Sequence, residues 1–445
     1  MTLIRYKFDK IGLAAPRIMM PSEDVSLAKW AVIACDQYTS DPSYWEDVDK
    51  TVGQSPSALR MFLPEAYLGT SFERKGASSI LREMKSYIKG GVLCELEPGF
   101  MLTRRTTSYG NVRNGLIVCV DLEEYSFEPG SQPLIRPTEK TILERIPPRV
   151  RIREKAPLEL PHILFLIDDP GKTVIEPLVK SRNLYTKLYD FNLMKNGGRI
   201  EGYHITEESA LSSIANSIIT LASKDNFRNR YGADRDLMLY AVGDGNHSLA
   251  AALQHWTNVK ARLGLDSSDE HPARYAMVEL INLHDEGMKF EAIHRVLFGC
   301  SADDAIAGLK ASFDVEIKET DGLAELLGLM NETSTDPDLH GFGMVSGGRM
   351  FFAGIKSPVH SLTVATVQEF LDGFSDSRSL AMDFIHDTDS AVALSKSGNI
   401  AFLLPPINKA GFFRTVIEEG TLPRKAFSMG HADEKRFYLE SRRII

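Results

Sequence analysis

The stretch that decides the fold is LMLYAVGDGNHSLAAALQHW, residues 237–256. Its apolar beginning, Leu237 to Val242, predicts a buried strand, and SLAAALQHW predicts a helix. The junction between the strand and the helix consists of Gly243, Asp244, Gly245, Asn246, His247 and Ser248. Polar and conformationally free residues at such a junction call for either a structural or a chemical explanation.

The chemical explanation is an anion site. The first N–H groups of a helix have no acceptor within the helix, and the positive end of the helix dipole lies beside them. Gly243 and Gly245 permit positive φ and a close approach of ligand to main chain. Asp244 repels phosphate, so we expect it to hold a Mg²⁺ ion that bridges to phosphate or to take a proton from a hydroxyl.

The remaining hinge residues fit the same interpretation. His247 is expected to donate to phosphate or to act as an acid or base, while Asn246 and Ser248 supply neutral hydrogen bonds. The structural alternative is an Asp-Gly turn followed by a helix cap and an ordinary histidine. The stretch is not a Walker loop, because the spacing and the lysine of that motif are missing.

Composition excludes several classes of protein. The 445 residues are 43% hydrophobic, and 60 acidic against 51 basic residues give a net charge of −9. This charge disfavours nucleic-acid binding, which relies on a basic surface. The cysteines (Cys35, Cys94, Cys119 and Cys300) are scattered, no signal-peptide core is present, and no apolar run approaches the ~20 residues that span a bilayer. We therefore expect a cytoplasmic protein without a membrane segment.

Strand-like and helix-like stretches are mixed along the chain. GLIVCVDL (115–122) and HILFLIDDP (162–170) predict buried strands, and residues 206–225 predict a helix. Residues 274–298 predict a strand, a turn, a second strand and then a helix. Beyond Cys300 the pattern changes to helix, strand, helix and a hairpin at Gly347-Gly348. The expectation is an α+β (mixed α/β) fold with a domain at 1–300, a smaller α+β domain at 301–375, and a C-terminal segment, 376–445, that packs back on the first.

A second candidate segment is RPTEKTILERIPPR, residues 136–149. Glu139 is a candidate general base, and Arg136 and Arg149 are candidates for a phosphate clamp. A solvated loop of mixed charge is the alternative.

Further candidates are dispersed. GNVRNG places Arg113 in a predicted hairpin loop, and Asp36 follows a strand-like run. His294 and Arg295 are adjacent on a presumed helix start, where both can face one ligand only at the helix end. The tail, 422–445, predicts a surface helix with internal ion pairs; its folding over the pocket with Arg424 and Lys425 is the alternative.

Several of these segments, in order along the chain, resemble an uncharacterised bacterial and archaeal family, domain of unknown function 1015. They are GNVRNGLIVCVDLEEY (110–125), IRPTEKTILERIPPR (135–149), the hinge, and FEAIHRVLF (290–298). The hinge of that family, usually Asp-Gly-His-His-Arg, is similar to the corner of the ParB/sulfiredoxin superfamily, which includes partition proteins, sulfiredoxins and a free-serine kinase. The resemblance implies a ParB/sulfiredoxin-like core with a pocket for a nucleoside di- or triphosphate.

The chain departs from the family pattern at the hinge. Asn246 stands where the family has its first histidine, and Ser248 where it has arginine, so a direct guanidinium–phosphate contact is lost. Sulfiredoxin chemistry needs a cysteine at Asn246 and is excluded. In the second segment, Glu139 and Arg149 are retained, while an aspartate before the arginine is lost.

Three functions fit this pattern. The first is a nucleotide-dependent phosphotransferase or phosphohydrolase that uses ATP, ADP or CTP with Mg²⁺ on a small hydroxyl metabolite. In it, Asp244 and Glu139 act on the nucleophile or the metal, while Arg113 or Arg149 neutralises charge. The second is a non-catalytic nucleotide-binding regulator or scaffold, and the third, disfavoured by charge, is a ParB-like DNA-associated protein. A homodimer is the default assembly.

Overall fold

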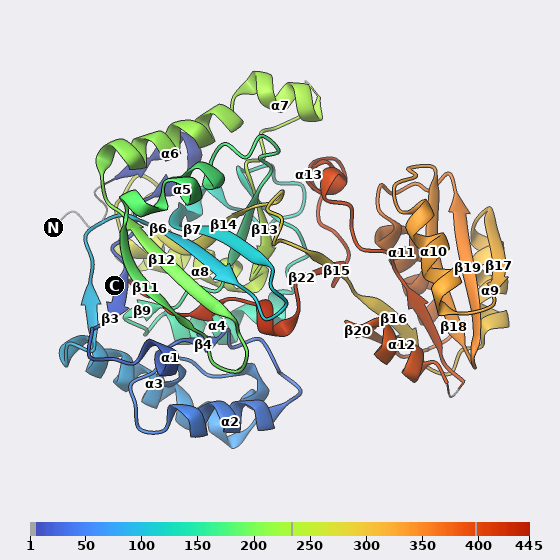
Figure 1. The fold of residues 1–445 in the computed structure, drawn as a ribbon, viewed down its shortest axis with the longest axis horizontal. Helices are drawn as coiled ribbons and strands as arrows, with labels where there is room; N and C mark the ends of the chain where they lie inside the picture. Colours follow the sequence, from blue (N-terminus) through green and yellow to red (C-terminus); the bar gives the residue numbers. More distant parts are fainter. Residues whose placement is uncertain (1–5, 233–234, 397) are drawn as a thin grey trace. The chain divides into compact units, whose positions relative to one another are not determined.

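The chain forms two compact units (Figure 1). Our computed structural model describes residues 6–232, 235–396 and 398–445. Unit 1 comprises Met1–Met288 together with His431–Ile445, and unit 2 comprises Lys289–Gly430. Helices and strands are mixed in both units, which confirms the predicted mixed α/β class. The division differs from the predicted boundaries near 300 and 375, because strands on both sides of these positions join the sheet of unit 2.

Unit 1 is built on a 10-stranded sheet. Along its main path the strands are β11 (Thr186–Asn192), β12 (Arg199–Ile205), β6 (Phe100–Thr106), β7 (Val112–Asp121), β14 (Tyr275–Asn282), β10 (Leu164–Ile167), β13 (Tyr240–Asp244) and β8 (Ile135–Pro137). β2 (Leu13–Ala14) pairs with β7, and β1 (Lys7–Phe8) pairs with β2. β10 is parallel to β14 and β13 is parallel to β8, while β10 and β13 are antiparallel.

Both faces of this sheet are buried. Along β7, Ile117 and Cys119 belong to one hydrophobic cluster, whereas Leu116, Val118 and Val120 belong to another. Successive side chains of a strand point to opposite faces, so the two clusters are the two cores of the unit. A continuous apolar run such as GLIVCVDL is what burial on both faces requires, and the predicted strand is confirmed.

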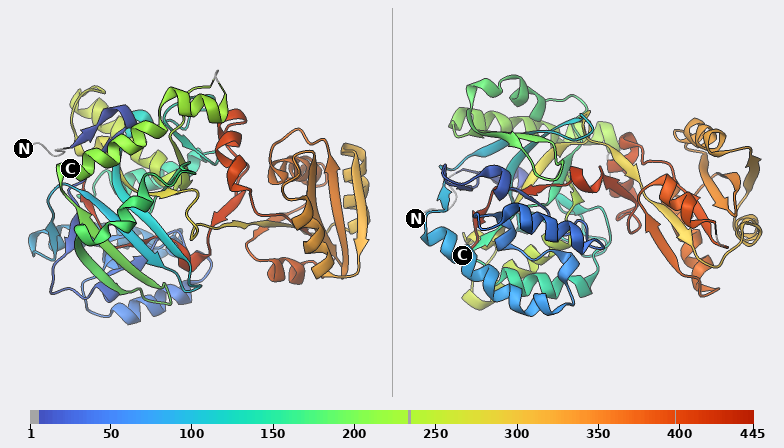
Figure 2. Two further views of the ribbon diagram at one scale, coloured as in Figure 1. Left: turned by 45° about the horizontal axis from the view of Figure 1, so that its top comes forward. Right: turned by 60° about the horizontal axis from the view of Figure 1, so that its bottom comes forward.

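Helices cover the two faces of the sheet (Figures 1 and 2). One core includes α5 (Ile175–Lys180), α6 (Glu208–Leu221) and α8 (Asn246–Leu263), and the other includes α1 (Leu27–Trp30), α2 (Pro42–Val52) and α3 (Ser71–Lys89). The remaining helices of unit 1 are α4 (Ile146–Arg153), which packs on α8, and α7 (Lys224–Tyr231). The Asp41 side chain caps α2 by accepting from the Tyr44 amide at 3.2 Å.

Three short strand pairs complete unit 1, and two of them involve the end of the chain. They are β3 (Met19–Pro21) with β5 (Leu93–Glu95), β4 (Val32–Ile33) with β23 (Phe437–Tyr438), and β9 (Leu158–Glu159) with β24 (Arg442–Arg443). The predicted surface helix in the tail is therefore wrong. Its charged residues pair mainly with distant segments, as in Arg436–Glu279 and Arg442–Glu159, and these buried pairs hold the tail in extended form.

Unit 2 has a six-stranded antiparallel sheet of its own. The strands, in order, are β17 (Val315–Thr320), β19 (Arg349–Lys356), β18 (Leu339–Ser346), β21 (Ile400–Leu403), β16 (His294–Leu297) and β20 (Met382–Ile385). Its other elements are the pair β15 (Phe290–Ala292) and β22 (Phe427–Met429), and helices α9 (Ala302–Ser312), α10 (Leu323–Thr333), α11 (Thr363–Asp376), α12 (Thr388–Leu394) and α13 (Lys409–Glu418). The hairpin predicted at Gly347-Gly348 is confirmed, and both glycines have positive φ.

One element of unit 2 contradicts the sequence-based expectation. Residues 290–298 were expected to continue into a helix, yet His294–Leu297 forms β16, which is paired on both sides by β20 and β21. All four of its residues are buried. Two partner strands satisfy the backbone of this short buried run, and tertiary pairing therefore overrides its local helical pattern.

Candidate functional site

The hinge after β13 has the predicted strand–helix geometry. β13 ends at Asp244, and α8 begins at Asn246. Gly245 between them has φ +85°, and a Cβ there would lie 3.1 Å from the Cα of Ile163. Glycine is needed here both for the left-handed conformation and for the close approach of the neighbouring chain. Gly243 lies inside the strand, so only Gly245 of the two glycines has the expected positive φ.

The start of α8 presents main-chain donors. The amides of Ser248 and Leu249 both donate to the Gly245 carbonyl at 3.0 Å. The Gly245 amide donates to Oδ1 of Asp244 at 2.8 Å. Within the described ranges, the amide of Asn246 has no acceptor. The first turn of the helix thus offers a donor of the kind that binds an anion.

A lysine from the end of the chain lies at this corner. Lys435 Nζ is 3.1 Å from Oδ2 of Asp244, and the two side chains are 11% and 27% exposed. The sequence interpretation missed Lys435, because the tail was interpreted as a surface helix. Arg424 and Lys425, the cations considered for this role, belong to unit 2. A carboxylate and an ammonium group therefore stand side by side at the mouth of α8.

Two buried arginines hold the backbone that carries Lys435. Arg105 donates from Nη1 to the carbonyls of Glu434, at 3.0 Å, and Lys435. Arg113 also donates to the Glu434 carbonyl at 3.0 Å. Burial, followed by the charge of Arg113, lowers the pKa of Arg105 to about 9. Arg113 was predicted in an exposed hairpin loop; it lies buried in β7, because the hairpin turns before Val112.

The predicted second segment reaches the hinge through β8. Pro137 is the register partner of Val242 in the parallel β8–β13 pair, so Glu139 and Asp244 follow two residues beyond these partners. The Thr138 amide donates to Oδ1 of the buried Asn246 at 3.2 Å, and its hydroxyl donates to the Val242 carbonyl at 2.6 Å. Glu139 is half-buried. Asn246 thus ties the two strand ends together.

His247 is also tied to this segment. Its Nε2 accepts a hydrogen bond from the Ile142 amide at 3.2 Å. A nitrogen that accepts such a bond carries no proton, so His247 fixes the loop that follows Glu139. Nε2 therefore cannot donate to phosphate while this bond is formed, and the predicted role of His247 as a phosphate donor or as an acid or base stays a prediction.

Ser248 begins a chain of side-chain hydrogen bonds that the sequence interpretation missed. Ser248 Oγ lies 2.9 Å from Nε2 of His162, and Nδ1 of His162 lies 2.8 Å from the hydroxyl of Tyr438. The Tyr438 hydroxyl donates to Sγ of Cys35 at 3.2 Å. His162 directly precedes the apolar run of β10, and only the fold brings it to Ser248.

Asp36 lies beside the Cys35 end of this series of hydrogen bonds. It follows Cys35 just beyond β4 and accepts from the Gln37 amide group at 3.0 Å. Burial raises the pKa of the Cys35 thiol well above its ordinary value, and the charges of Asp36 and Glu65 raise it further. Burial likewise raises the pKa of Tyr438. Both groups therefore keep their protons at neutral pH.

The other predicted cations have partners of their own. Arg149, on α4, forms an ion pair with Glu65. Arg136 is buried in β8 and donates to the carbonyls of Pro133, at 3.2 Å, and Asp236, at 2.8 Å. Arg136 thus braces the backbone, because its position in the edge strand β8 places its donors beside these two carbonyls.

His294 and Arg295 lie in unit 2, in β16. His294 Nδ1 accepts from the Leu404 amide at 3.1 Å, and Nε2 is 3.0 Å from the Thr388 hydroxyl. Arg295 is fully buried, and its guanidinium binds the Gln368 side chain and main-chain carbonyls. Their predicted role at a helix end is wrong, because no helix begins there and both side chains serve the core.

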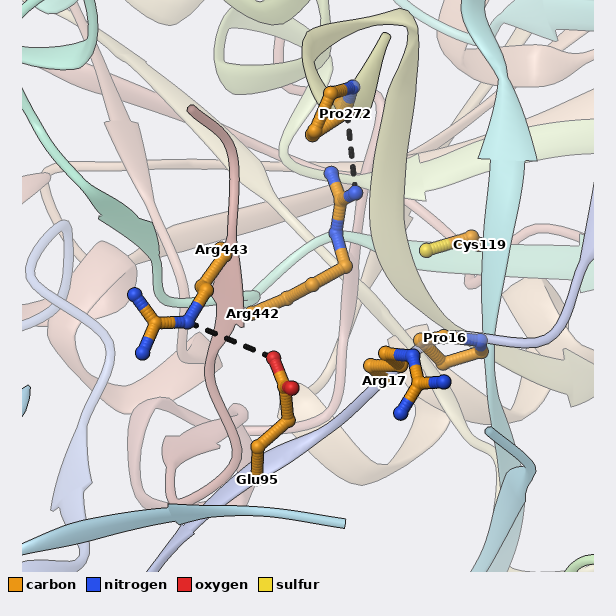
Figure 3. A pocket seen from close by; sticks show the side chains of 7 residues that line it. All are labelled: Pro16, Arg17, Glu95, Cys119, Pro272, Arg442 and Arg443. Atoms are coloured by element: carbon orange, nitrogen blue, oxygen red, sulfur yellow. Dashed lines mark hydrogen bonds and ion pairs between the residues drawn. The ribbon is translucent and has the colours of Figure 1, made fainter. Parts of the chain in front are cut away.

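A pocket described elsewhere in unit 1 shares no residue with the hinge (Figure 3). Its volume of about 20 Å³ holds roughly one water molecule. The lining residues are Pro16, Arg17, Glu95, Cys119, Pro272, Arg442 and Arg443. Burial raises the pKa of the Cys119 thiol to about 12, so this pocket offers no reactive thiolate.

Two further findings bear on the predicted ligands and location. Across the described ranges, no three Asp, Glu, His or Cys side chains gather as a metal-binding cluster. None of the helices in the described part of the chain is both long and apolar enough to cross a membrane.

Comparison with known proteins gives one family and several distant structures. A family model described as a protein of unknown function, DUF1015, matches residues 16–374. A conserved hypothetical protein from Pyrococcus furiosus is 13% identical, with a TM-score of 0.35 over 72% of this chain and 93% of that chain. A free serine kinase in complex with AMP is 12% identical, with a TM-score of 0.36 over 72% and 90%. SbnI with C-terminal truncation from Staphylococcus aureus is 11% identical, with a TM-score of 0.32 over 73% and 81%. No curated protein matches.

Proposed function

We propose that this chain, which belongs to the DUF1015 family of proteins of unknown function, is a nucleotide-dependent phosphotransferase or phosphohydrolase. Its substrate would be a small hydroxyl metabolite, and its phosphate donor ATP, ADP or CTP. The proposal includes a ParB/sulfiredoxin-like assignment for unit 1, which rests on the resemblance of the hinge. A cytoplasmic location and a homodimer remain predictions.

The observation that carries the proposal is the Asp244–Lys435 pair at the start of α8. Lys435 Nζ lies 3.1 Å from Oδ2 of Asp244, beside a helix terminus whose Asn246 amide has no acceptor within the described ranges. Phosphate oxygens bind ammonium groups and helix amides together. Ser248 replaces the arginine usual in the family hinge, and Lys435 supplies a cation from another segment.

The residues present also suit Mg²⁺. Asp244 and Glu139 offer carboxylate oxygens at the adjacent ends of two parallel strands. Mg²⁺ prefers oxygen ligands and is commonly held by one or two carboxylates together with substrate phosphates. When bound, the ion would neutralise charge on the phosphate oxygens.

Each side chain then has a distinct task in the proposed reaction. Lys435 and the Asn246 amide hold the phosphates, and Asp244 would hold the metal. Glu139 takes the proton of the attacking hydroxyl, because it follows the end of β8, which pairs with the strand that carries Asp244, and is partly exposed. Asn246 and His247 keep the Glu139 loop in place through Thr138 and Ile142.

Nucleotide binding and turnover test this proposal. Calorimetry with Mg²⁺–ATP, –ADP and –CTP should give an affinity that Lys435→Met lowers about 10- to 100-fold, the loss of one charged hydrogen bond. Asp244→Asn should lower product formation from a panel of small hydroxyl compounds by at least about 100-fold while the protein stays folded.

A matched control lies at the other end of the same helix. Lys260 forms an ion pair with Glu123 at 2.6 Å near the end of α8. Lys260→Met should leave nucleotide affinity unchanged, and Lys435→Arg, which keeps the charge, should restore most of it. Equal affinity in wild type and Lys435→Met would overturn the proposal, and binding without any turnover would leave a regulatory or scaffold function.

A further inference from the structure

We propose that Ser248 is a nucleophile and His162 its general base, and that Ser248 accepts the phosphoryl group before the metabolite does. The choice of a nucleotide as donor rests on the proposed function above. The serine–histidine pair itself rests on geometry, since Ser248 Oγ and His162 Nε2 are 2.9 Å apart. A nucleophile within hydrogen-bond reach of a base, with the base oriented by a third group, is the arrangement that covalent catalysis requires.

The hydrogen bond from Tyr438 to Cys35 favours one tautomer of His162. The Tyr438 hydroxyl donates its only proton to Sγ of Cys35 at 3.2 Å. Its oxygen is then an acceptor for Nδ1–H of His162, 2.8 Å away. A neutral imidazole protonated at Nδ1 has its lone pair at Nε2, and this lone pair faces Ser248. The serine proton thus points at the basic nitrogen.

Tyr438 holds the histidine rigidly. Its backbone is paired with Val32 in the β23–β4 ladder, and the Cys35 amide donates to its hydroxyl at 3.4 Å. The rings of Tyr438 and His162 meet edge to face, with centroids 5.6 Å apart and an interplanar angle of 82°. Tyr438 is therefore a positioning residue, in the place that a carboxylate takes in other serine–histidine sites.

Cys35, at the other end of these hydrogen bonds, is unsuited to act as the nucleophile. Burial keeps its thiol protonated, and its sulfur accepts from Tyr438. Ser248 is half-exposed, so a substrate can reach its hydroxyl. Ser248 is also the third residue of α8, where the helix dipole favours developing negative charge.

The reaction balances without another reagent. Ser248 Oγ forms a bond to the terminal phosphorus of the nucleotide as the bond to the bridging oxygen breaks, and its electrons leave with the departing nucleotide. The serine proton passes to Nε2 of His162. In the second half, the metabolite hydroxyl gives its proton to Glu139 and displaces Ser248, which recovers its proton from His162. This order predicts ping-pong kinetics.

A nucleotide-free probe tests the pair directly. The full-length protein is treated with a fluorophosphonate, and labelling is followed by mass spectrometry. We expect the label on Ser248, a rate that falls at least about 100-fold in His162→Gln, and a pH profile that follows imidazole deprotonation. Tyr438→Phe should shift this pH profile and slow labelling about tenfold. Equal labelling rates in wild type and His162→Gln, or no label on Ser248, overturn the pair.

The control is another serine at a helix start. Ser223 caps α7 by accepting from the Asn226 amide at 3.3 Å, and among the described residues it has no imidazole partner. It should remain unlabelled, and Ser223→Ala should label Ser248 at the wild-type rate. Unchanged tryptophan fluorescence in each variant shows that unit 1 is folded, since all three tryptophans of the chain lie there.

Incubation with ATP, ADP or CTP separates the two proposals. Phosphoserine at Ser248, lost in His162→Gln, supports both. Turnover that persists in Ser248→Ala overturns the covalent route and leaves the proposed function standing. If Ser248 reacts with fluorophosphonate but the protein binds no nucleotide, the serine–histidine pair is supported and the nucleotide assignment is contradicted.

Discussion

The hinge of unit 1 and the His294–Arg295 pair of unit 2 contain similar side chains with opposite surroundings. At the hinge, Asp244 and Ser248 remain partly exposed, and their partners are the side chains of Lys435 and His162. In β16, Arg295 is fully buried, and its guanidinium donates hydrogen bonds to the Gln368 side chain and to main-chain carbonyls. The hinge can exchange its partners for a ligand, whereas β16 cannot do so without loss of its core.

This difference separates a candidate site from a structural cluster. Both regions contain charged side chains and a histidine. What distinguishes them is whether the polar atoms are bound by side chains at an accessible surface or by backbone within the interior. Buried polar groups that lose a partner pay the full cost of desolvation, and the two regions should therefore respond very differently to substitution.

The largest expected effect is at Arg295. Arg295→Met should lower the free energy of unfolding of unit 2 by about 3–5 kcal/mol, since the carbonyl of Ile293 and the side chain of Gln368 lose their donor. Chemical unfolding followed by far-UV circular dichroism should show an early transition, while tryptophan fluorescence, which reports unit 1, should stay at its wild-type midpoint.

The matched substitution in unit 1 is Ser248→Ala, which removes a half-exposed hydroxyl. It should move either transition by less than about 1 kcal/mol. A small effect of Arg295→Met, or a large one of Ser248→Ala, would reverse the assignment of which region is structural.

The fold was predictable where local pattern and burial agree. GLIVCVDL is almost entirely apolar and became a central strand, and the helix predicted at residues 206–225 was found as α6. The tail was mispredicted because its alternating charges satisfy the helical spacing, whereas its actual partners, Glu279 and Glu159, are far away in sequence. Long-range ion pairs leave no mark in a local pattern.

The candidate site was predictable only in part, for the same reason. The strand–helix hinge and its neighbour β8 were visible as motifs, and their polar residues do lie together. Lys435, His162 and Tyr438 come from segments with no recognisable motif, and only the pairings of β23 with β4 and β10 with β13 bring them to α8. Arg113 looked like a loop residue because the turn begins earlier than its glycines suggest.

The second prediction compares the two ends of α8. Gly245 and Gly264 both have positive φ, +85° and +67°, but a Cβ on Gly245 would meet the Ile163 backbone at 3.1 Å, while one on Gly264 would have open space. Gly264→Ala should therefore cost about 1 kcal/mol, and Gly245→Ala about 3 kcal/mol, since contact is added to strain. Denaturant titrations followed by tryptophan fluorescence measure both, and equal costs would show that Gly245 is a plain helix cap.

The smallest expected effect is the part of the pH dependence of unit 2 that comes from His294. Burial, followed by the charge of Arg295, lowers the pKa of His294 to about 4. Below pH ~6.5, His294 therefore binds a proton in the unfolded chain but not in the folded unit. The free energy of unfolding of unit 2 falls as the pH decreases from there toward 4. At pH 5 the loss from His294 is about 2 kcal/mol relative to pH 8. His294→Gln should remove this share of the slope from the circular dichroism transition, and a similar share should remain from His340, whose pKa burial also lowers to about 4.

A histidine of the same unit whose pKa is shifted in the opposite direction provides the control. Despite partial burial, hydrogen bonds to Glu369 and Glu419 raise the pKa of His360. Its contribution is present at acid pH and is lost as the pH rises through the folded value. His360→Gln should therefore steepen the acid loss that His294→Gln reduces. Parallel slopes in the two variants would show that β16 tolerates a charged imidazole, and the contrast between a sealed strand and an open hinge would then lose its physical basis.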